Sequence, residues 1–138
     1  MNSTTTPQFE LTARVYYEDT DAGGIVYHTA YLRFAERGRT EYLREVGFDH
    51  RNLCQETGGG FVVRHMEIDY RSAARLDDEL IVSTRVTVAS GASARIEQNV
   101  MRGSDMLVTV AVQLAFLGDD GRPKRLPDAV RQAFVALT

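Results

Sequence analysis

The apolar residues of this 138-residue chain change their spacing after residue 46, and that change limits the folds open to it. Between about residues 29 and 46 they recur every three or four positions, which predicts one long amphipathic helix. From residue 62 to residue 117 they alternate with polar residues, which predicts three or four successive strands. One helix for so many strands indicates the α+β class, with the helix packed on an antiparallel sheet.

The alternation also predicts which residues face the core. A first strand runs from Phe9 to Tyr17, and a last strand from Met106 to Leu117 is apolar on both faces, as expected of a central strand. The other predicted core faces are Val62, Met66, Ile68 and Tyr70; Leu80, Val82, Thr84, Val86 and Val88; and Ala94, Ile96, Gln98 and Val100.

Glycine and proline place the remaining boundaries. Gly38 inside the helix costs about 1 kcal/mol relative to alanine, so a sheet pressed close to the helix is expected to compensate. Gly47 is a predicted helix end. A short helical turn is expected at residues 49–56, and a closing turn or short helix from Pro127 to Leu137. The expected organisation is one domain over residues 8–138, with residues 1–7 frayed.

Composition excludes several functions. The net charge is −3 and the basic residues are scattered, which argues against a nucleic-acid surface. The single cysteine, Cys54, favours a reducing cytoplasm. We expect no signal peptide and no membrane span. Histidine and cysteine are too widely spaced to predict a metal site.

One segment suggests chemistry. After Tyr17 come Glu18, Asp19, Thr20 and Asp21, and a Gly23-Gly24 pair then leads into the long helix, which is expected to start near His28. The first N–H groups of a helix lack internal partners and carry partial positive charge. A carboxylate beside such donors is suited to attack, or to direct water at, a carbonyl whose oxygen becomes negative.

The same segment resembles the hotdog-fold acyl-CoA thioesterases, specifically the YbgC and 4-hydroxybenzoyl-CoA thioesterase group. The run DTDAGGIVYH at residues 19–28 is its most specific part, and the likeness continues through residues 69–73 and 77–80. Ser72-Ala73 stands where the family usually has Pro-Ala. Further matching positions are Tyr17, Tyr31, Phe34, Glu36, Arg39, Thr40 and Glu41.

The resemblance implies a hotdog, in which a five-stranded antiparallel sheet wraps a long central helix. It implies an acyl-CoA thioesterase, needing no cofactor, whose active sites lie at the interface of a homodimer or homotetramer. Asp21 then occupies the position of the catalytic carboxylate, as nucleophile or general base, and the backbone N–H of His28 that of the oxyanion donor. The implied substrate-contacting residues are Gly24, Ile25, Val26, Tyr27, Tyr31, Ser90, Gly91, Ala92 and Ser93.

Other interpretations remain open at this point. Asp21 also suits an Asx turn over the glycine pair. Asp19 and Glu36 are reserve carboxylates, but Asp19 also suits a capping or salt-bridging role, and Glu36 suits an ion pair on the helix surface. The alternative for His28 is that its side chain acts as a general acid or contacts the substrate. Alternative functions are hydrolysis of acyl-carrier-protein or aromatic acyl-CoA thioesters, and a non-catalytic hotdog that binds acyl-CoA or a partner near the Tol-Pal machinery.

Overall fold

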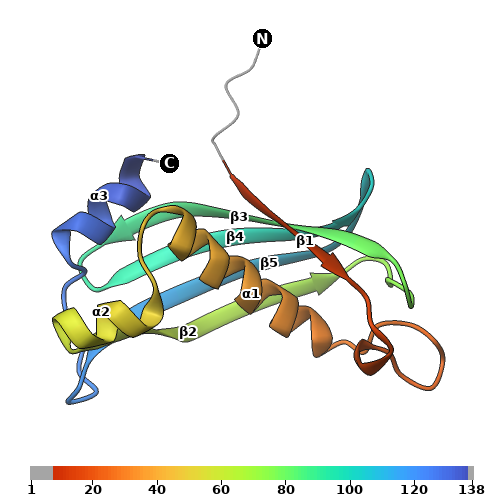
Figure 1. The fold of residues 1–138 in the computed structure, drawn as a ribbon, viewed down its shortest axis with the longest axis horizontal. Helices are drawn as coiled ribbons and strands as arrows, with labels where there is room; N and C mark the ends of the chain where they lie inside the picture. The colour runs from red at the N-terminus through yellow and green to blue at the C-terminus, as the bar shows by residue number, and fades with distance from the viewer. Residues whose placement is uncertain (1–7, 137–138) are drawn as a thin grey trace, which may run out of the picture.

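The structure, a computed structural model, describes residues 8–136, and for Ala136 only the backbone (Figure 1). The predicted frayed segment 1–7 lies outside the described residues, as do residues 137 and 138. The strands are β1 (Phe9–Arg14), β2 (Gly59–Tyr70), β3 (Glu79–Ser90), β4 (Ser93–Arg102) and β5 (Asp105–Gly118). The helices are α1 (Ala30–Glu45), α2 (His50–Thr57) and α3 (Asp128–Ala136), with a 3-10 turn at Tyr17–Asp19.

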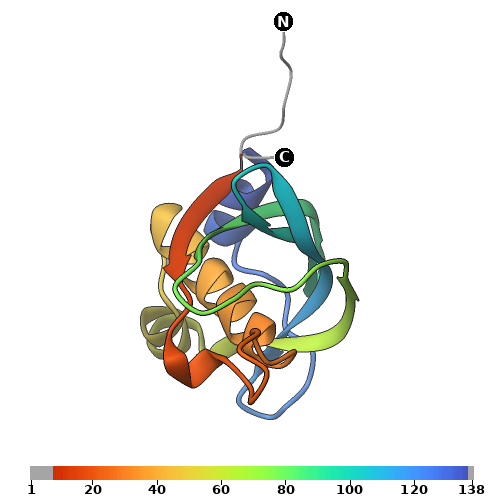
Figure 2. The ribbon, with the colours of Figure 1, turned by 90° about the vertical axis from the view of Figure 1, so that its right-hand side faces the viewer.

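The strands form one antiparallel sheet in the order β1-β3-β4-β5-β2. Seen end on, this sheet curls around α1 (Figure 2). The predicted α+β architecture is therefore confirmed, and so is the internal position of β5. Among the described residues, no helix is long and apolar enough to cross a membrane.

Two β-bulges overturn part of the predicted core face. In β2 the register shifts between Val63 and His65, and in β3 it shifts between Val86 and Val88. Each extra residue reverses the inward and outward alternation. Val62 and Val88, both predicted to face inward, are therefore exposed by 43% and 49%.

The end of the first strand also differs from prediction, whereas the ends of the long helix agree with it. β1 ends at Arg14, and Tyr17, predicted to face the core, starts the 3-10 turn and is 83% exposed. The helix starts at Ala30 with Thr29 as its N-cap, which agrees with the expected start near His28 to within two residues. Its end is confirmed at Gly47, which has a φ of 99° and whose N–H donates to the carbonyl of Arg44 at 2.9 Å.

Gly38 is where α1 approaches the sheet most closely. A Cβ there would lie 2.9 Å from Val82 Cγ1 and 3.0 Å from both Thr84 Oγ1 and Gln98 Nε2. The buried Gln98 amide donates to the carbonyl of Ala35 at 2.8 Å. The expected close contact between helix and sheet is thus present, and a buried hydrogen bond accompanies it.

Gly38→Ala is expected to destabilise the fold by about 1–3 kcal/mol, because overpacking against β3 and β4 outweighs the gain of about 1 kcal/mol in helix propensity. Urea unfolding followed by circular dichroism measures this difference. The matched control is Arg37→Ala, an exposed position one residue earlier, for which a change below about 0.5 kcal/mol is expected. Equal or greater stability of Gly38→Ala would show that the contact is loose in solution.

A second prediction concerns Tyr42, which is 3% exposed and whose hydroxyl has no partner among the described residues. Burial raises the pKa of Tyr42 to about 12. The unfolded chain therefore ionises first, and stability falls between about pH 10 and pH 12, by at most about 1.4 kcal/mol per pH unit. Tyr42→Phe is expected to lose less stability than wild type between about pH 8 and pH 11 in urea titrations. Parallel losses would contradict a buried phenol.

Candidate functional site

The segment between β1 and α1 folds back on itself as a small irregular hairpin. The N–H of Asp21 donates to the carbonyl of Ile25 at 2.9 Å, and that of Tyr27 donates to the carbonyl of Asp19 at 2.8 Å. The turn passes through Gly24, whose φ of 81° is costly for any residue with a Cβ. The glycine pair is therefore explained by a tight reversal, which places residues 19–21 alongside residues 25–27.

Asp21 lies exposed at the tip of this hairpin. Its Oδ1 accepts the N–H of Gly23 at 2.8 Å, which is the Asx turn considered above. Within residues 8–136 no cation pairs with this carboxylate, and Oδ2 has no hydrogen-bond partner. One oxygen is thus held by the backbone, while the other is available to a substrate or to water.

Asp19 is engaged on both oxygens. It is buried, its Oδ2 accepts the N–H of Tyr16 at 2.8 Å, and its Oδ1 lies 3.4 Å from Arg33 Nη2. This carboxylate fastens the 3-10 turn to α1 and so fits the capping interpretation.

His28 precedes the N-cap of α1 by one residue. The N–H of Ala30 donates to the carbonyl of Tyr27 at 2.8 Å, which makes residues 27–30 a turn with His28 and Thr29 at its centre. In the described part of the chain, no oxygen accepts the N–H of His28. Its carbonyl is fixed by the hydroxyl of Tyr70 at 3.0 Å, and its exposed ring lies 4.5 Å from that of Tyr27. A free, oriented backbone donor therefore stands on the same hairpin as the Asp21 carboxylate.

Other predicted contact residues near the hairpin divide by burial. Ile25 is half-buried, Val26 is buried and Tyr27 is 48% exposed. Tyr31 is 2% exposed, and its hydroxyl accepts the N–H of Ala74 at 2.9 Å. In this structure Tyr31 is a core residue that connects α1 to the segment between β2 and β3.

The predicted contact residues Ser90, Gly91, Ala92 and Ser93 lie at the far end of the sheet. They form the turn between β3 and β4, whereas the start of β3 lies beside the hairpin segment, where Val15 donates to the carbonyl of Asp78 at 2.9 Å. β3 has 12 residues, which at ~3.3 Å per residue separates its ends by roughly 36 Å. Within one chain, this turn and Asp21 do not form one site.

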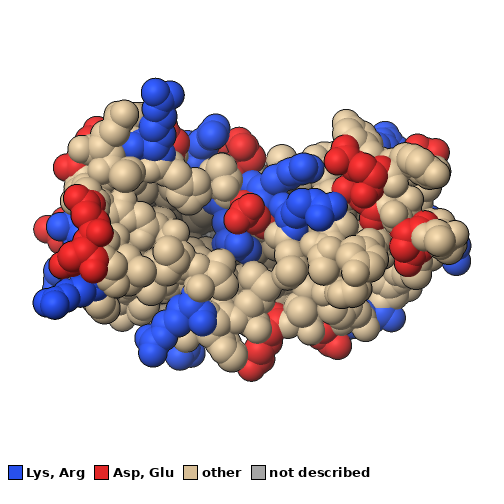
Figure 3. Space-filling view, turned by 90° about the horizontal axis from the view of Figure 1, so that it is seen from below, with Lys and Arg blue, Asp and Glu red and all other residues tan. Residues whose placement is uncertain are grey.

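The reserve carboxylate Glu36 lies at a separate cavity of about 210 Å³. At 1.5 Å per residue, Glu36 is about 9 Å along α1 from Ala30. Burial lowers the pKa of the neighbouring Arg39, and the charge of Glu36 opposes that shift. Figure 3 shows one face of the molecule, on which the surface is hollowed beside a mixed group of basic and acidic side chains. The cavity is lined mainly by apolar side chains of α1, β2, β4, β5 and α3, including Tyr42, Leu43, Phe61, Ile96, Leu114 and Phe134.

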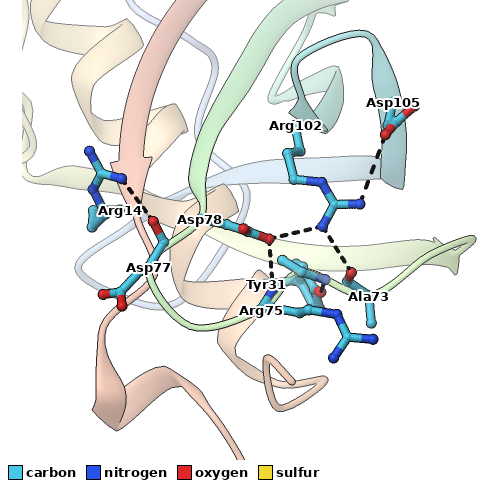
Figure 4. Close-up of polar contacts among 9 residues, drawn as sticks. Arg14, Tyr31, Ala73, Arg75, Asp77, Asp78, Arg102 and Asp105 are labelled. Atoms are coloured by element: carbon cyan, nitrogen blue, oxygen red, sulfur yellow. Dashed lines mark hydrogen bonds and ion pairs between the residues drawn. The ribbon is translucent and has the colours of Figure 1, made fainter. Parts of the chain in front are cut away.

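A third group of side chains was not singled out from the sequence. Arg102, at the end of β4, bonds Asp78 at 2.9 Å, and the hydrogen bond from Arg102 is the main reason that the pKa of Asp78 is lowered (Figure 4). The acidic pair Asp77-Asp78 was visible in the sequence, but Arg102, the partner of Asp78, lies 24 positions further along the chain. No local pattern reveals such a pair.

Within residues 8–136, no group of three or more His, Cys, Asp or Glu side chains is arranged to hold a metal ion. The chemically distinctive features are therefore a carboxylate with one oxygen that accepts no hydrogen bond, on Asp21, and the unpaired backbone N–H of His28 on the same hairpin. That pair is suited to reactions in which a carbonyl oxygen gains negative charge.

The known proteins to which this chain is similar are thioesterases. The thioesterase-like superfamily matches residues 15–134. An acyl-CoA thioesterase YbgC from Haemophilus influenzae is 48% identical over 128 residues, covering 91% of this chain and 93% of the relative. An acyl-CoA thioester hydrolase YbgC from Escherichia coli is 40% identical, covering 94% and 97%. The crystal structure of a probable thioesterase from Bartonella henselae is 43% identical, with a TM-score of 0.83 over 88% of this chain and 100% of that one.

These similarities extend over nearly the whole described chain and include the hairpin that carries Asp21 and His28. The chain therefore belongs to the thioesterase-like superfamily and, within it, to the YbgC family of hotdog-fold acyl-CoA thioesterases, which makes it a thioester hydrolase.

Proposed function

We propose that this protein hydrolyses acyl-CoA to a carboxylic acid and CoA, with Asp21 as the catalytic carboxylate and the N–H of His28 as the oxyanion donor. The observation that carries the proposal is the hairpin, on which a carboxylate with one free oxygen and an unpaired backbone N–H occur together. Those two groups supply a base or nucleophile and an oxyanion donor, so the reaction proposed needs no metal or redox cofactor.

Two routes use the same groups. In the first, Asp21 attacks the thioester carbonyl and CoA leaves as a thiolate that takes up a proton. Water then hydrolyses the resulting mixed anhydride and restores the carboxylate. In the second, Asp21 takes a proton from water as the water attacks the carbonyl, and CoA again leaves. In both routes the N–H of His28 donates to the oxygen that becomes negative.

The acyl class is open between aliphatic and aromatic groups. The exposed rings of Tyr27, His28 and Tyr70 adjoin the proposed oxyanion donor, with His28 and Tyr70 6.3 Å apart, so a planar acyl group has rings to pack against. Acyl-carrier protein is the second candidate carrier, because it presents the same thioester. A thiol-release assay over aliphatic and aromatic acyl-CoA esters and acyl-carrier-protein esters separates these substrates.

Assembly completes the site in this proposal. β2 is an edge strand, and Val62, Val63 and Tyr70 on it are each more than 40% exposed. Such edges are normally paired or covered. We expect two chains to pair their β2 edges around a two-fold axis, and a dimer of dimers to follow.

The same pairing accounts for the distant turn at residues 90–93. Antiparallel pairing lays the Gly59 end of one β2 beside the Tyr70 end of the other. Gly59 pairs with Gly118, after which the chain runs through residues 122–125 and returns to the turn, where Leu126 donates to the carbonyl of Gly91 at 2.9 Å. The exposed cations of this segment, Arg122, Lys124 and Arg125, have no ion-pair partner in the described residues, and they suit the phosphates of a CoA held near Asp21 of the other chain.

The compartment proposed is the cytoplasm. Cys54 is exposed and unpaired, which suits a reducing environment.

Asp21→Asn is expected to lower kcat by about 10²-fold or more with little change in KM, because the amide keeps the shape but is neither base nor nucleophile. Steady-state thiol release with a saturating acyl-CoA measures this loss. The control is an unchanged circular dichroism spectrum and melting temperature. A variant with near wild-type kcat would remove Asp21 from the mechanism and make Glu36 the candidate carboxylate.

His28→Ala is expected to lower kcat much less than Asp21→Asn does, because alanine keeps the backbone N–H. The same assay compares the two variants. A loss as large as that of Asp21→Asn would show that the imidazole itself takes part in the reaction.

The shared-site proposal predicts that Val62→Asp, at the β2 edge, weakens both association and activity, because pairing of the two edges would bury the new charge. Val88→Asp is the matched control, since Val88 is 49% exposed and lies on β3 away from that edge. Light scattering and thiol release at the same protein concentration check both variants. A fully active wild-type monomer would overturn the shared site.

A further inference from the structure

We infer that Arg102 and Asp78 form a positioning pair for the reaction: together they fix the segment at residues 71–78, against which the hairpin carrying Asp21 and His28 is built. The inference rests on the proposed roles of Asp21 and His28. Neither Arg102 nor Asp78 is assigned contact with the substrate.

The segment 71–78 connects β2 to β3 and is held from two sides. The N–H groups of Arg71 and Ser72 both donate to the carbonyl of Leu107, at 2.8 and 3.1 Å. The N–H of Ala74 donates to the buried hydroxyl of Tyr31. Its first half is therefore tied to β5 and to α1.

Its second half depends on Arg102. Arg102 Nη1 donates to Asp78 Oδ2 at 2.9 Å and to the carbonyl of Ala73 at 3.4 Å, so one guanidinium spans the segment (Figure 4). Asp78 Oδ2 also accepts the N–H of Arg75 at 2.9 Å. Asp105 lies 3.9 Å from the other arm of Arg102. The pair thereby closes residues 73–78 into a fixed loop.

This loop holds the proposed catalytic hairpin through backbone contacts. The N–H of Val26 donates to the carbonyl of Ala74 at 2.9 Å, and Ile25 forms an isolated bridge with Arg75. Ile25 in turn accepts the N–H of Asp21, and His28 follows Val26 by two residues. A shift of residues 74 and 75 therefore moves both proposed catalytic groups.

If the Arg102–Asp78 pair only stabilised the fold, its loss would lower activity no more than it lowers the amount of folded protein. The side chains of Arg102 and Asp78 are 34% and 23% exposed, and ion pairs with that degree of exposure contribute about 1 kcal/mol or less to folding. Misplacement of reacting groups by about 1 Å can cost about 10²-fold in rate. A loss of kcat far larger than the loss of folded protein would thus separate positioning from stability.

The experiment compares Arg102→Gln with Arg85→Gln. Arg85 forms an ion pair with Glu97 at 2.6 Å between β3 and β4, is 33% exposed, and touches neither the segment 71–78 nor the hairpin in any contact of the described residues. Each purified variant is assayed for kcat and KM by thiol release, for melting temperature, and for amide hydrogen exchange at residues 25–28.

For Arg102→Gln we expect kcat to fall about 10-fold with KM within about 2-fold of wild type, and faster exchange at Val26. Arg85→Gln should change neither kcat nor this exchange. Arg102→Lys keeps a positive charge beside Asp78 and should therefore lose less kcat than Arg102→Gln. Asp78→Asn should reproduce the loss, and the double variant with Arg102→Gln should add little to it, as expected for residues that act together.

Equal kcat values for Arg102→Gln and Arg85→Gln would overturn the inference, as would a loss that merely follows the folded fraction or a double variant with fully additive losses. Asp21→Asn in the same assay keeps the two proposals apart. If that variant retains activity, the proposed catalytic role of Asp21 fails. If it is inactive while Arg102→Gln is normal, only the positioning role fails.

Discussion

The contact of α1 with the sheet at Gly38 determines where the helix lies, and the other parts of the site are arranged around that helix. Because residue 38 has no Cβ, the helix backbone reaches the side chains of Val82 and Thr84 directly. The Gln98 side chain, which is fully buried, both donates and accepts hydrogen bonds. Its amide donates to the carbonyl of Ala35 and to the Thr84 hydroxyl, while its oxygen accepts Arg39 at 2.9 Å. A buried amide with all these partners specifies one position of the helix along the sheet, because any slip leaves polar groups unpaired.

From that fixed helix the site extends through short segments with little regular structure. The hairpin at residues 19–28 has few apolar contacts of its own, and Val26 is its one buried apolar residue. Its geometry is supplied by neighbours: Tyr70 holds the carbonyl of His28, and Ala74 holds the N–H of Val26. Segments of this kind belong to the least stable part of a fold. Their precision therefore depends on contacts with more rigid elements, and Tyr31, anchored in the core, is one link to them.

The sequence predicted the parts of this fold that depend on local spacing. The long helix, its end at Gly47, the short second helix and a run of three or four later strands follow from periodicity and glycine placement. Val62 and Val88 were misplaced because a β-bulge leaves no mark on hydrophobic alternation until the partner strand is known. The segment with Asp21 was singled out because its motif is contiguous, although the hairpin that it forms was not predicted. Arg102 was not found because its partner Asp78 lies 24 positions away and is brought to it only by the sheet.

Asp21 and Glu36, two of the carboxylates considered for catalysis, are both exposed but have different surroundings, and the difference bears on how the site works. Glu36 lies at a cavity with mostly apolar walls, whereas Asp21 lies at a hairpin tip. A cavity alone does not make Glu36 catalytic, because Glu36 lies inside α1, where the helix uses its own backbone N–H groups, whereas the N–H of His28 belongs to the hairpin of Asp21. Exposure is nevertheless a handicap for Asp21, since hydrogen bonds to a developing oxyanion stabilise it far more when water is excluded. A second chain laid along the β2 edge would cover this end of the helix. In this interpretation assembly does more than protect an open strand: it supplies the low-dielectric surroundings that the proposed carboxylate and N–H require.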